Sequence, residues 1–162
     1  MRRRTFRWSQ NRDALTIGVV GAGIVGLAHA WIASRAGHRV ILFERHPSAR
    51  GASIRNFGMV WPIGQPNGPR YSTALRSRSL WCELLSETGF WHGTSGSLHL
   101  AYRDDELAVL EEFAQLSSTI GIECRLLRKS EVLEISPPAR RASSTEPALL
   151  GGLLSKTELC VN

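Results

Sequence analysis

Residues 15–45 read LTIGVVGAGIVGLAHAWIASRAGHRVILFER, and this stretch determines the fold class. It begins with an apolar run typical of a β-strand, Leu15 to Val20. A glycine-rich turn and a helical pattern of small and apolar residues follow, and a second strand is predicted from Arg39 to Phe43. The order strand, helix, strand predicts a βαβ unit with parallel strands.

The glycines of the turn have the spacing Gly21-x-Gly23-x-x-Gly26. In a dinucleotide site the first glycine permits the tight turn and the second leaves room for a pyrophosphate near the backbone. The third lets the helix lie close to the strand. The helix N-terminus then offers unpaired N–H groups and partial positive charge to the phosphates. The predicted pyrophosphate-binding segment consists of Gly21, Ala22, Gly23, Ile24, Val25 and Gly26.

Glu44 follows the second predicted strand, where a carboxylate can accept hydrogen bonds from the hydroxyls of a ribose. An acidic residue at this position favours a free ribose over a ribose 2′-phosphate, so FAD or NAD is preferred to NADP. The glycine spacing alone is weak evidence, because glycine-rich turns are common. The flanking strands, the helix, Gly37 and Glu44 agree with it, so the sequence favours a dinucleotide site over a purely structural βαβ unit.

Residues 1–12, MRRRTFRWSQNR, carry five arginines ahead of this unit. A basic start followed by an apolar run is also the pattern of a signal peptide or membrane anchor. Residues 10–13 interrupt the approach to the apolar run, and the glycines and His29 within it would insert poorly into a membrane. We therefore expect a basic disordered tail over residues 1–14, with export as an alternative.

Charge and cysteine usage disfavour several other classes. The net charge of the 162-residue chain is +6, but five of its 20 basic residues lie within residues 1–12 and all 14 acidic residues follow them. The nearly neutral remainder gives little support to nucleic-acid binding. Cys82, Cys124 and Cys160 are odd in number and widely spaced, which fits a reducing cytoplasm better than a disulfide framework. The histidines lack metal-ligand spacing, so we expect no metal, no nucleic-acid partner and no membrane partner.

The remaining chain is predicted to alternate loops, helices and strands. Residues 46–70 are predicted as a loop, because they are rich in polar residues, glycine and proline and have no sustained period. Helices are predicted over residues 71–88, 104–119 and 129–135, strands over 97–102, 122–127 and 149–154, and a mobile connector over 137–147.

Two other catalytic patterns fail on inspection. The acidic run Asp104-Asp105-Glu106 is typical of a helix N-terminus rather than of paired catalytic carboxylates. The segment from Gly93 to Ser97, GTSGS, has a serine where a nucleophile elbow has its final glycine, and a strand rather than a helix is predicted after it.

The segments GAGIVGLAHAWIASRAGHRVILFER and GASIRNFGMVWP resemble the N-terminus of the FAD-dependent oxidoreductases related to D-amino acid oxidase, glycine oxidase and sarcosine oxidase. The second segment resembles in particular a bacterial subgroup associated with aminophosphonate breakdown. The resemblance covers most of residues 15–162 and ends in GGLLSKTELCVN, which is similar to the return from substrate domain to cofactor domain. The implied fold is α/β: a Rossmann-like FAD/NAD(P)-binding βαβ domain with the beginning of an inserted substrate domain, truncated.

The resemblance implies a reaction and a site. Relatives transfer a hydride from the carbon beside an amine to flavin, so FAD and a small amine or amino-acid-like substrate are expected. By matching positions, Glu44 holds the adenosine ribose, and Arg45 follows it as is usual in the family. The residues implied along the phosphate and flavin ring are Ser53, Arg55, Asn56 and Gly58. Arg55 stands where relatives with covalent flavin carry a histidine, so the FAD is expected to be non-covalent; the resemblance identifies no catalytic residue.

The resemblance also divides the chain. The expected segments are a tail at 1–14, an FAD-binding portion at 15–93, a partial substrate-domain segment with connector at 94–147, and the start of the return to the cofactor domain at 148–162. The chain is shorter than the family members it resembles, so we expect it to be too short to act alone. We also expect it to leave apolar surface and a sheet edge uncovered. A non-functional truncated gene product and a small NAD-binding module remain the alternatives.

Overall fold

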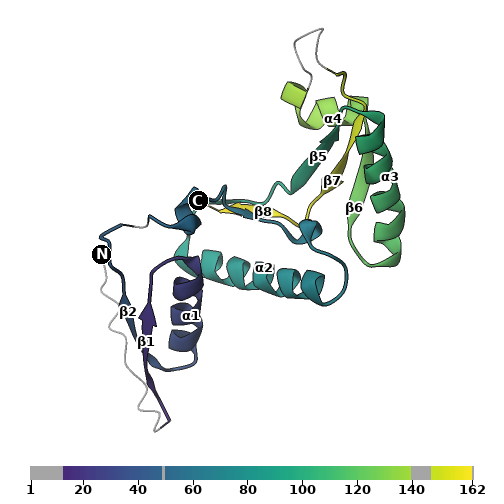
Figure 1. Cartoon of the computed structure of the whole chain (residues 1–162). Coiled ribbons are helices and arrows are strands. Elements are labelled where there is room, and N and C mark those ends of the chain that lie inside the picture. The colour runs from purple at the N-terminus through teal and green to yellow at the C-terminus, as the bar shows by residue number, and fades with distance from the viewer. Residues whose placement is uncertain (1–12, 49, 140–146, 162) are drawn as a thin grey trace. The chain divides into compact units, whose positions relative to one another are not determined.

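The computed structural model describes residues 13–48, 50–139 and 147–161 (Figure 1). These residues divide into two compact units between Phe57 and Gly58, here called unit 1 and unit 2. Most of the predicted tail and the middle of the predicted connector, residues 140–146, lie outside the described residues.

Unit 1 is the predicted βαβ unit. Its elements are strand β1 (Thr16–Val20), helix α1 (Ile24–Arg35), strand β2 (Arg39–Phe43) and a 3₁₀ turn, η1 (Ala52–Arg55). The two strands pair in parallel, from Thr16 opposite Arg39 to Val20 opposite Phe43. Gly37 has a positive φ of 87°, which reverses the chain between α1 and β2. The fold expected from the glycine-rich stretch is therefore confirmed.

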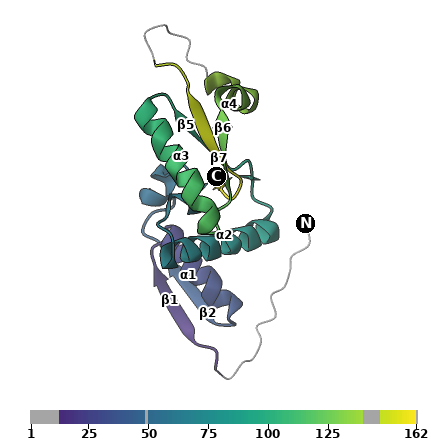
Figure 2. The same cartoon turned by 90° about the vertical axis from the view of Figure 1, so that its right-hand side faces the viewer.

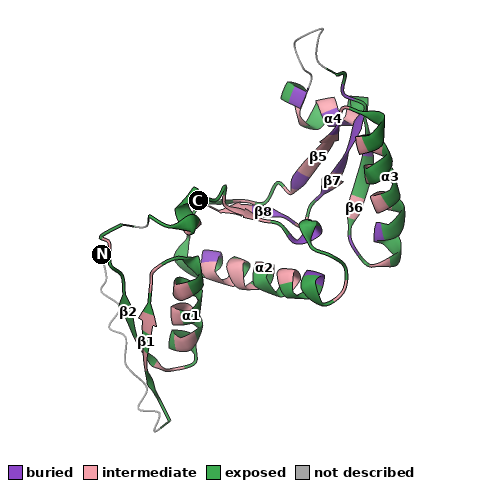
Figure 3. Cartoon of the chain, viewed as in Figure 1, coloured by how far each residue is buried: buried purple, intermediate pink, exposed green. Residues whose placement is uncertain are grey.

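The apolar residues of unit 1 are largely exposed (Figure 3). No described residue of this unit is buried, and Val20 is 89% exposed and Phe57 79% exposed. Strands β1 and β2 form a two-stranded sheet. Uncovered apolar surface and sheet edges were expected from the sequence, and the described part of unit 1 has both.

Unit 2 contains the three predicted helices and a main antiparallel sheet. Its helices are α2 (Pro69–Thr88), α3 (Asp104–Thr119) and α4 (Lys129–Ile135), with 3₁₀ turns η2 (Pro62–Gly64) and η3 (Pro137–Ala139). Its strands are β3 (Met59–Val60), β4 (His92–Gly93), β5 (Ser97–Ala101), β6 (Cys124–Arg128), β7 (Gly151–Ser155) and β8 (Leu159–Val161). The N–H of Gly89 donates to the carbonyl of Leu85 at 2.9 Å and ends α2, as predicted.

Strand β7 lies at the centre of the main sheet, in the order β5-β7-β6. Helix α3 lies across one face of this sheet (Figure 2), and α4 packs against β6 and β7. Successive side chains of β7 point to opposite faces. Leu153 therefore joins the apolar cluster of α3, which includes Phe113, and Leu154 joins the cluster around Val132 of α4.

The predicted start of β7 was two residues too early, because Leu149 extends the apolar run and is buried without belonging to the strand. The apolar run predicted a strand over residues 149–154, but β7 begins at Gly151. A Cβ on Gly152 would lie 2.7 Å from the carbonyl oxygen of His99, and one on Gly151 would lie 2.9 Å from that of Leu127. Close pairing with the strands on both sides therefore requires glycine at these two positions.

The second sheet of unit 2, in the order β3-β8-β4, was not predicted. Its strands have two or three residues, too few to show an alternating pattern. All three strands therefore lie in regions that the sequence had left without regular structure. Gly58 allows the close approach of the chain to this sheet, because its φ is +67° and a Cβ there would lie 1.9 Å from the carbonyl oxygen of Val161.

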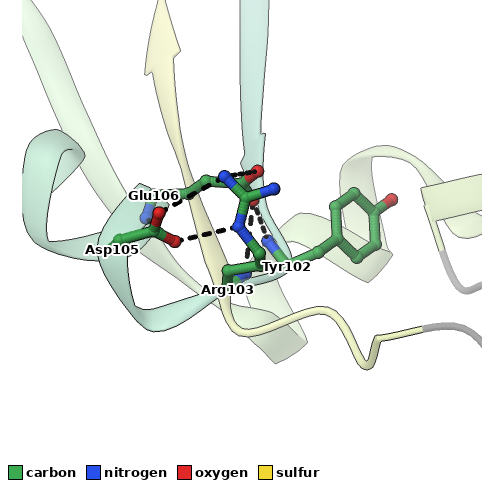
Figure 4. Close-up of polar contacts among 4 residues, drawn as sticks. All are labelled: Tyr102, Arg103, Asp105 and Glu106. Carbon is green, nitrogen blue, oxygen red and sulfur yellow. Dashed lines mark hydrogen bonds and ion pairs between the residues drawn. The ribbon is translucent and has the colours of Figure 1, made fainter.

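The acidic run at residues 104–106 forms the first turn of α3, as predicted (Figure 4). Glu106 accepts hydrogen bonds from the N–H groups of Tyr102 at 2.8 Å and Arg103 at 3.2 Å. Arg103 Nε donates to Asp105 at 3.0 Å. These carboxylates cap the helix and offset its N-terminal partial charge.

Leu153→Ala should destabilise unit 2 much more than Leu126→Ala. The two leucines face each other across β7 and β6, but Leu153 is 1% exposed and Leu126 is 37% exposed. Removing the buried side chain should lower the free energy of unfolding by about 2–5 kcal/mol, and the exposed one by less than about 1 kcal/mol. Urea unfolding followed by circular dichroism measures both, and equal losses would contradict the core described above.

Candidate dinucleotide-binding site

The glycine-rich turn of unit 1 is built by close backbone contacts. Gly21 has a φ of +99° and its N–H donates to the carbonyl of Phe43 at 2.7 Å. A Cβ on Gly26 would lie 1.9 Å from the carbonyl oxygen of Gly21, so the helix can approach the turn this closely only with glycine there. The structure thus explains two of the glycine roles inferred from the spacing: Gly21 forms the tight turn, and Gly26 lets the helix lie close to it.

The remaining glycine of the motif, Gly23, is open. A Cβ there would meet a single side-chain atom, Ser53 Oγ at 3.2 Å, and no backbone. Gly23 is the N-cap of α1 and has extended backbone, and it supplies no side chain to the helix N-terminus. Packing within unit 1 therefore does not by itself require glycine at this position, whereas a ligand lying against the backbone would.

The N-terminus of α1 presents backbone donors beside this glycine. Ile24 N–H donates to Ser53 Oγ at 2.9 Å, whereas the N–H groups of Val25 and Gly26 have no acceptor among the described residues. The first turn contains no acidic residue. Unpaired N–H groups and the helix dipole together favour an anion, and no carboxylate of the helix competes for that place.

Glu44 lies beside the turn rather than apart from it. Its Oε2 accepts a hydrogen bond from Ala22 N–H at 2.8 Å, and its Oε1 accepts one from His46 N–H at 3.0 Å. These two bonds, the Ala22 bond first, lower the pKa of Glu44 below its ordinary value. Glu44 is exposed, and each carboxylate oxygen has capacity for a second hydrogen bond. The ionised carboxylate can therefore hold the turn and still accept a hydroxyl.

The other predicted site residues are placed less uniformly. Ser53, in η1, is hydrogen-bonded to the turn, so the structure brings it together with the glycines and Glu44. Arg45 contacts His46 through its Nε at 3.3 Å. Arg55 and Asn56 are exposed at the end of η1, with no recorded bond to the turn among the described residues. Gly58 belongs to unit 2, and its close approach to Val161 already explains why it is glycine.

Sequence reasoning did not find a polar cluster in unit 2 formed by Ser97, His99 and Glu158. Glu158 is 1% exposed and accepts hydrogen bonds from the Ser97 hydroxyl and the Ile63 N–H. No motif joins these residues, and Ser97 was considered only as part of a failed nucleophile elbow.

Over the described ranges, no group of three or more metal-ligating side chains is present. No described helix combines the length and apolar character needed to cross a bilayer.

Unit 1 has the features of a dinucleotide-binding βαβ protein. These are a strand, a glycine turn, a helix N-terminus and an acidic residue at the end of the next parallel strand. The family model described as "DAO: FAD dependent oxidoreductase" matches residues 16–162. The chain belongs to this family of FAD-dependent oxidoreductases.

Two relatives show how much of the family the chain represents. It is 30% identical over 129 residues to the glycine oxidase of Geobacillus kaustophilus, an alignment that covers 75% of this chain and 34% of that protein. It is 36% identical over 72 residues to the D-amino-acid oxidase of Streptomyces coelicolor, covering 44% of this chain and 22% of that protein. The chain thus spans about a third or less of the length of these relatives.

Solved structures agree with the fold. The crystal structure of glycine oxidase from Geobacillus kaustophilus has a TM-score of 0.73 and 28% identity, and the match covers 92% of this chain and 40% of that one. Glycine oxidase from Bacillus cereus has a TM-score of 0.74 at 21% identity, covering 91% of this chain and 39% of that one. The resemblance and the α/β fold class inferred from the sequence are confirmed.

Lowering the pH should release the Ala22 N–H from Glu44. Because the pKa of Glu44 is lowered in the folded protein, the two backbone bonds are fully present above the ordinary glutamate value of about 4.3. They are lost as the pH falls through the lowered folded value, and the stability they contribute is lost with them. The Ala22 amide shift in ¹⁵N–¹H spectra should titrate with a midpoint below about 4.3.

Glu44→Gln is the matched control for this titration. The substitution keeps the size of the side chain and removes the ionisable group, so the Ala22 amide should no longer titrate in acid. An Ala22 amide shift in the unmodified protein that does not change with pH would contradict the hydrogen bond to Glu44.

Proposed function

We propose that this chain provides the FAD-binding part of an oxidoreductase that transfers a hydride from an amine or amino acid to flavin. The observation that carries the proposal is the arrangement around Gly23. An open glycine, unpaired helix N–H groups and an ionised Glu44 lie together within unit 1. The family to which the chain belongs is FAD-dependent, and the donor set suits a pyrophosphate with a ribose beside it.

Each predicted residue has a role in this proposal. The N–H groups of Val25 and Gly26 bind pyrophosphate oxygens, and Gly23 allows the close approach. Glu44 accepts a ribose hydroxyl while it holds the turn through Ala22. The remaining proposed contacts, along the phosphate and the flavin ring, are made by Gly21, Ile24, Arg45, Ser53, Arg55, Asn56 and Gly58. When bound, flavin supplies the hydride acceptor, and the residues named here bind and orient it.

The proposal also covers how FAD is held, how the chain is divided into segments and in which cellular compartment the protein lies. FAD is held without a covalent bond, because Arg55 stands where covalent relatives carry histidine. Residues 15–93 belong to the cofactor-binding portion, 94–147 to a substrate-domain segment, and 148–162 to the return between them. The three cysteines are free, which suits a cytoplasmic protein.

FAD should bind more tightly than NAD. Both nucleotides contain ADP, so the glycine turn and Glu44 contribute equally to the two affinities. The difference between the FAD and NAD affinities therefore measures the contacts of the flavin half. We expect FAD to bind at least about tenfold more tightly than NAD, a difference of about 1.4 kcal/mol. Calorimetric titration of the 162-residue chain with FAD, NAD and ADP measures the three affinities. Tighter binding of NAD, with no response to FAD, would establish the NAD-binding alternative instead.

Gly23→Val should abolish FAD binding without unfolding unit 1. A Cβ there meets only Ser53 Oγ in the protein, and the branched side chain extends into the proposed place of the pyrophosphate. Gly18→Val is the matched control, because a Cβ at Gly18 lies at an ordinary 3.7 Å from Phe43, away from the turn. Glu44→Ala should weaken FAD binding by a smaller factor than Gly23→Val, because it removes only an acceptor for the ribose hydroxyls.

The same titrations, with thermal melting as a check of folding, distinguish a binding site from a structural turn. If both Gly23→Val and Glu44→Ala left the FAD affinity unchanged, the βαβ unit would be structural. Loss of binding in Gly18→Val as well would mean that any valine in this unit disturbs its fold.

A further inference from the structure

Glu158 is a buried carboxylate that the proposed cofactor site does not use. It lies just before β8, and it is 1% exposed. Its Oε1 accepts a hydrogen bond from Ile63 N–H at 3.2 Å, and its Oε2 accepts one from the Ser97 hydroxyl at 3.2 Å. In this second bond Ser97 is the donor and Glu158 the acceptor, so the single Ser97 proton points toward Glu158.

The orientation of that proton determines the protonation of His99. Ser97 and His99 are two residues apart on β5 and lie on the same side of the strand, and Ser97 Oγ is 3.1 Å from His99 Nε2. A serine hydroxyl has one proton, and here Glu158 already receives it. Nε2 must therefore carry a proton and donate it to Ser97. In the neutral imidazole this leaves Nδ1 unprotonated, with a lone pair that can accept a hydrogen bond.

The surroundings keep His99 neutral and fix its ring. Burial lowers the pKa of His99, and the negative charge of Glu158 opposes this effect. Trp61 stacks on the imidazole, with ring centroids 5.7 Å apart and planes inclined by 21°. A Cβ on Gly64 would lie 2.4 Å from Cε3 of Trp61, so the indole is itself held closely against the backbone.

His99 Nδ1 is the unused polar atom of this cluster. It has no hydrogen-bond partner among the described residues, whereas Nε2, Ser97 Oγ and both Glu158 oxygens have partners. His99 is partly exposed and Trp61 is 42% exposed, so the pair lies at the surface of unit 2.

We propose that His99 Nδ1, with Trp61 beside it and Ser97 and Glu158 behind it, is a subsite for the amino group of a small-molecule ligand. An ammonium or amine donates a hydrogen bond to the lone pair of Nδ1, and the buried charge of Glu158 attracts a cation. A carboxylate at the same place would meet a lone pair and a negative charge, so it is rejected. Ser97 and Glu158 are positioning residues, because they act through the ring of His99.

This inference deepens the proposed function, because it assigns the amino end of the substrate to residues of unit 2. It rests on that function for the identity of the ligand as a substrate. The protonation of His99 and the binding of a simple amine do not involve FAD. A failure of the FAD titrations and a failure of the subsite are therefore distinguishable.

The first test is the position of the imidazole proton, read from long-range ¹⁵N–¹H spectra of the full chain at neutral pH. We expect Nε2 of His99 to be protonated and Nδ1 to be unprotonated. Glu158→Gln should reverse this. The amide oxygen of Gln faces Ile63 N–H, its NH₂ group then donates to Ser97, and the Ser97 proton turns to Nε2, so the ring proton moves to Nδ1. A protonated Nδ1 in the unmodified protein would overturn the proposal.

The second test uses methylammonium and acetate as matched probes of opposite charge. Methylammonium should produce a saturable shift of the His99 Nδ1 resonance in the unmodified protein, and acetate should produce none. In Glu158→Gln, Nδ1 becomes a donor and the buried charge is gone, so the response to methylammonium should be lost and acetate should replace it. The absence of a saturable methylammonium response in the unmodified protein would overturn the subsite.

Variants of Ser97 keep the proposal testable if Glu158→Gln does not fold. Ser97→Ala removes the link between Glu158 and His99, so both neutral forms of the ring should be present and the methylammonium shift should weaken. Ser97→Thr retains the hydroxyl on a strand and should restore one protonated nitrogen and the full shift. If Ser97→Ala left the ring protonation and the methylammonium shift unchanged, Ser97 would have no positioning role and the proposal would fail.

Discussion

The candidate cofactor site depends on the contact between the first turn of α1 and the backbone of Gly21. There is no room for a side chain at Gly26, so the helix comes close to the turn that follows β1. The first helical turn therefore lies at the carboxyl ends of both parallel strands. Glu44 follows the second of these strands and accepts a hydrogen bond from Ala22 in the glycine-rich turn. A larger residue at position 26 would move the helix, and the donors and the acceptor would no longer converge.

Glu44 illustrates how one side chain can have a structural role and a binding role at once. Its carboxylate satisfies two backbone donors of its own unit, which keeps it ionised and oriented. Those bonds leave acceptor capacity on both oxygens, so ligand binding need not break them. Glu158 in unit 2 likewise accepts hydrogen bonds from one backbone N–H and one hydroxyl. In the subsite proposed above, its bond to Ser97 decides which ring nitrogen of His99 carries the proton.

Much of the secondary structure followed from local pattern. The helices at 104–119 and 129–135 and strand β2 have the predicted bounds, and α2 begins two residues before its predicted start, at Pro69. Apolar periodicity, acidic first turns and a terminal glycine are local signals, so they can be read without knowing the fold. Strands β3, β4 and β8 lacked such signals, because strands this short are defined by their partners. The start of β7 was placed two residues too early, because an apolar run indicates burial, and Leu149 is buried without pairing as a strand residue.

The sequence by itself determined the βαβ unit, the family and the residues of the glycine turn, because each of these depends on residues close together in the chain. The conformation of Gly21, the helix that starts at Ile24 and the strand that ends before Glu44 are all encoded within one short stretch. Only the tertiary structure decided that Ser53 would bond to the helix N-terminus and that Glu158 would lie beside Ser97, 61 residues away, and Ile63, 95 residues away. Such partners meet because strands and helices pack, and a buried carboxylate then binds whichever donors the packing brings to it.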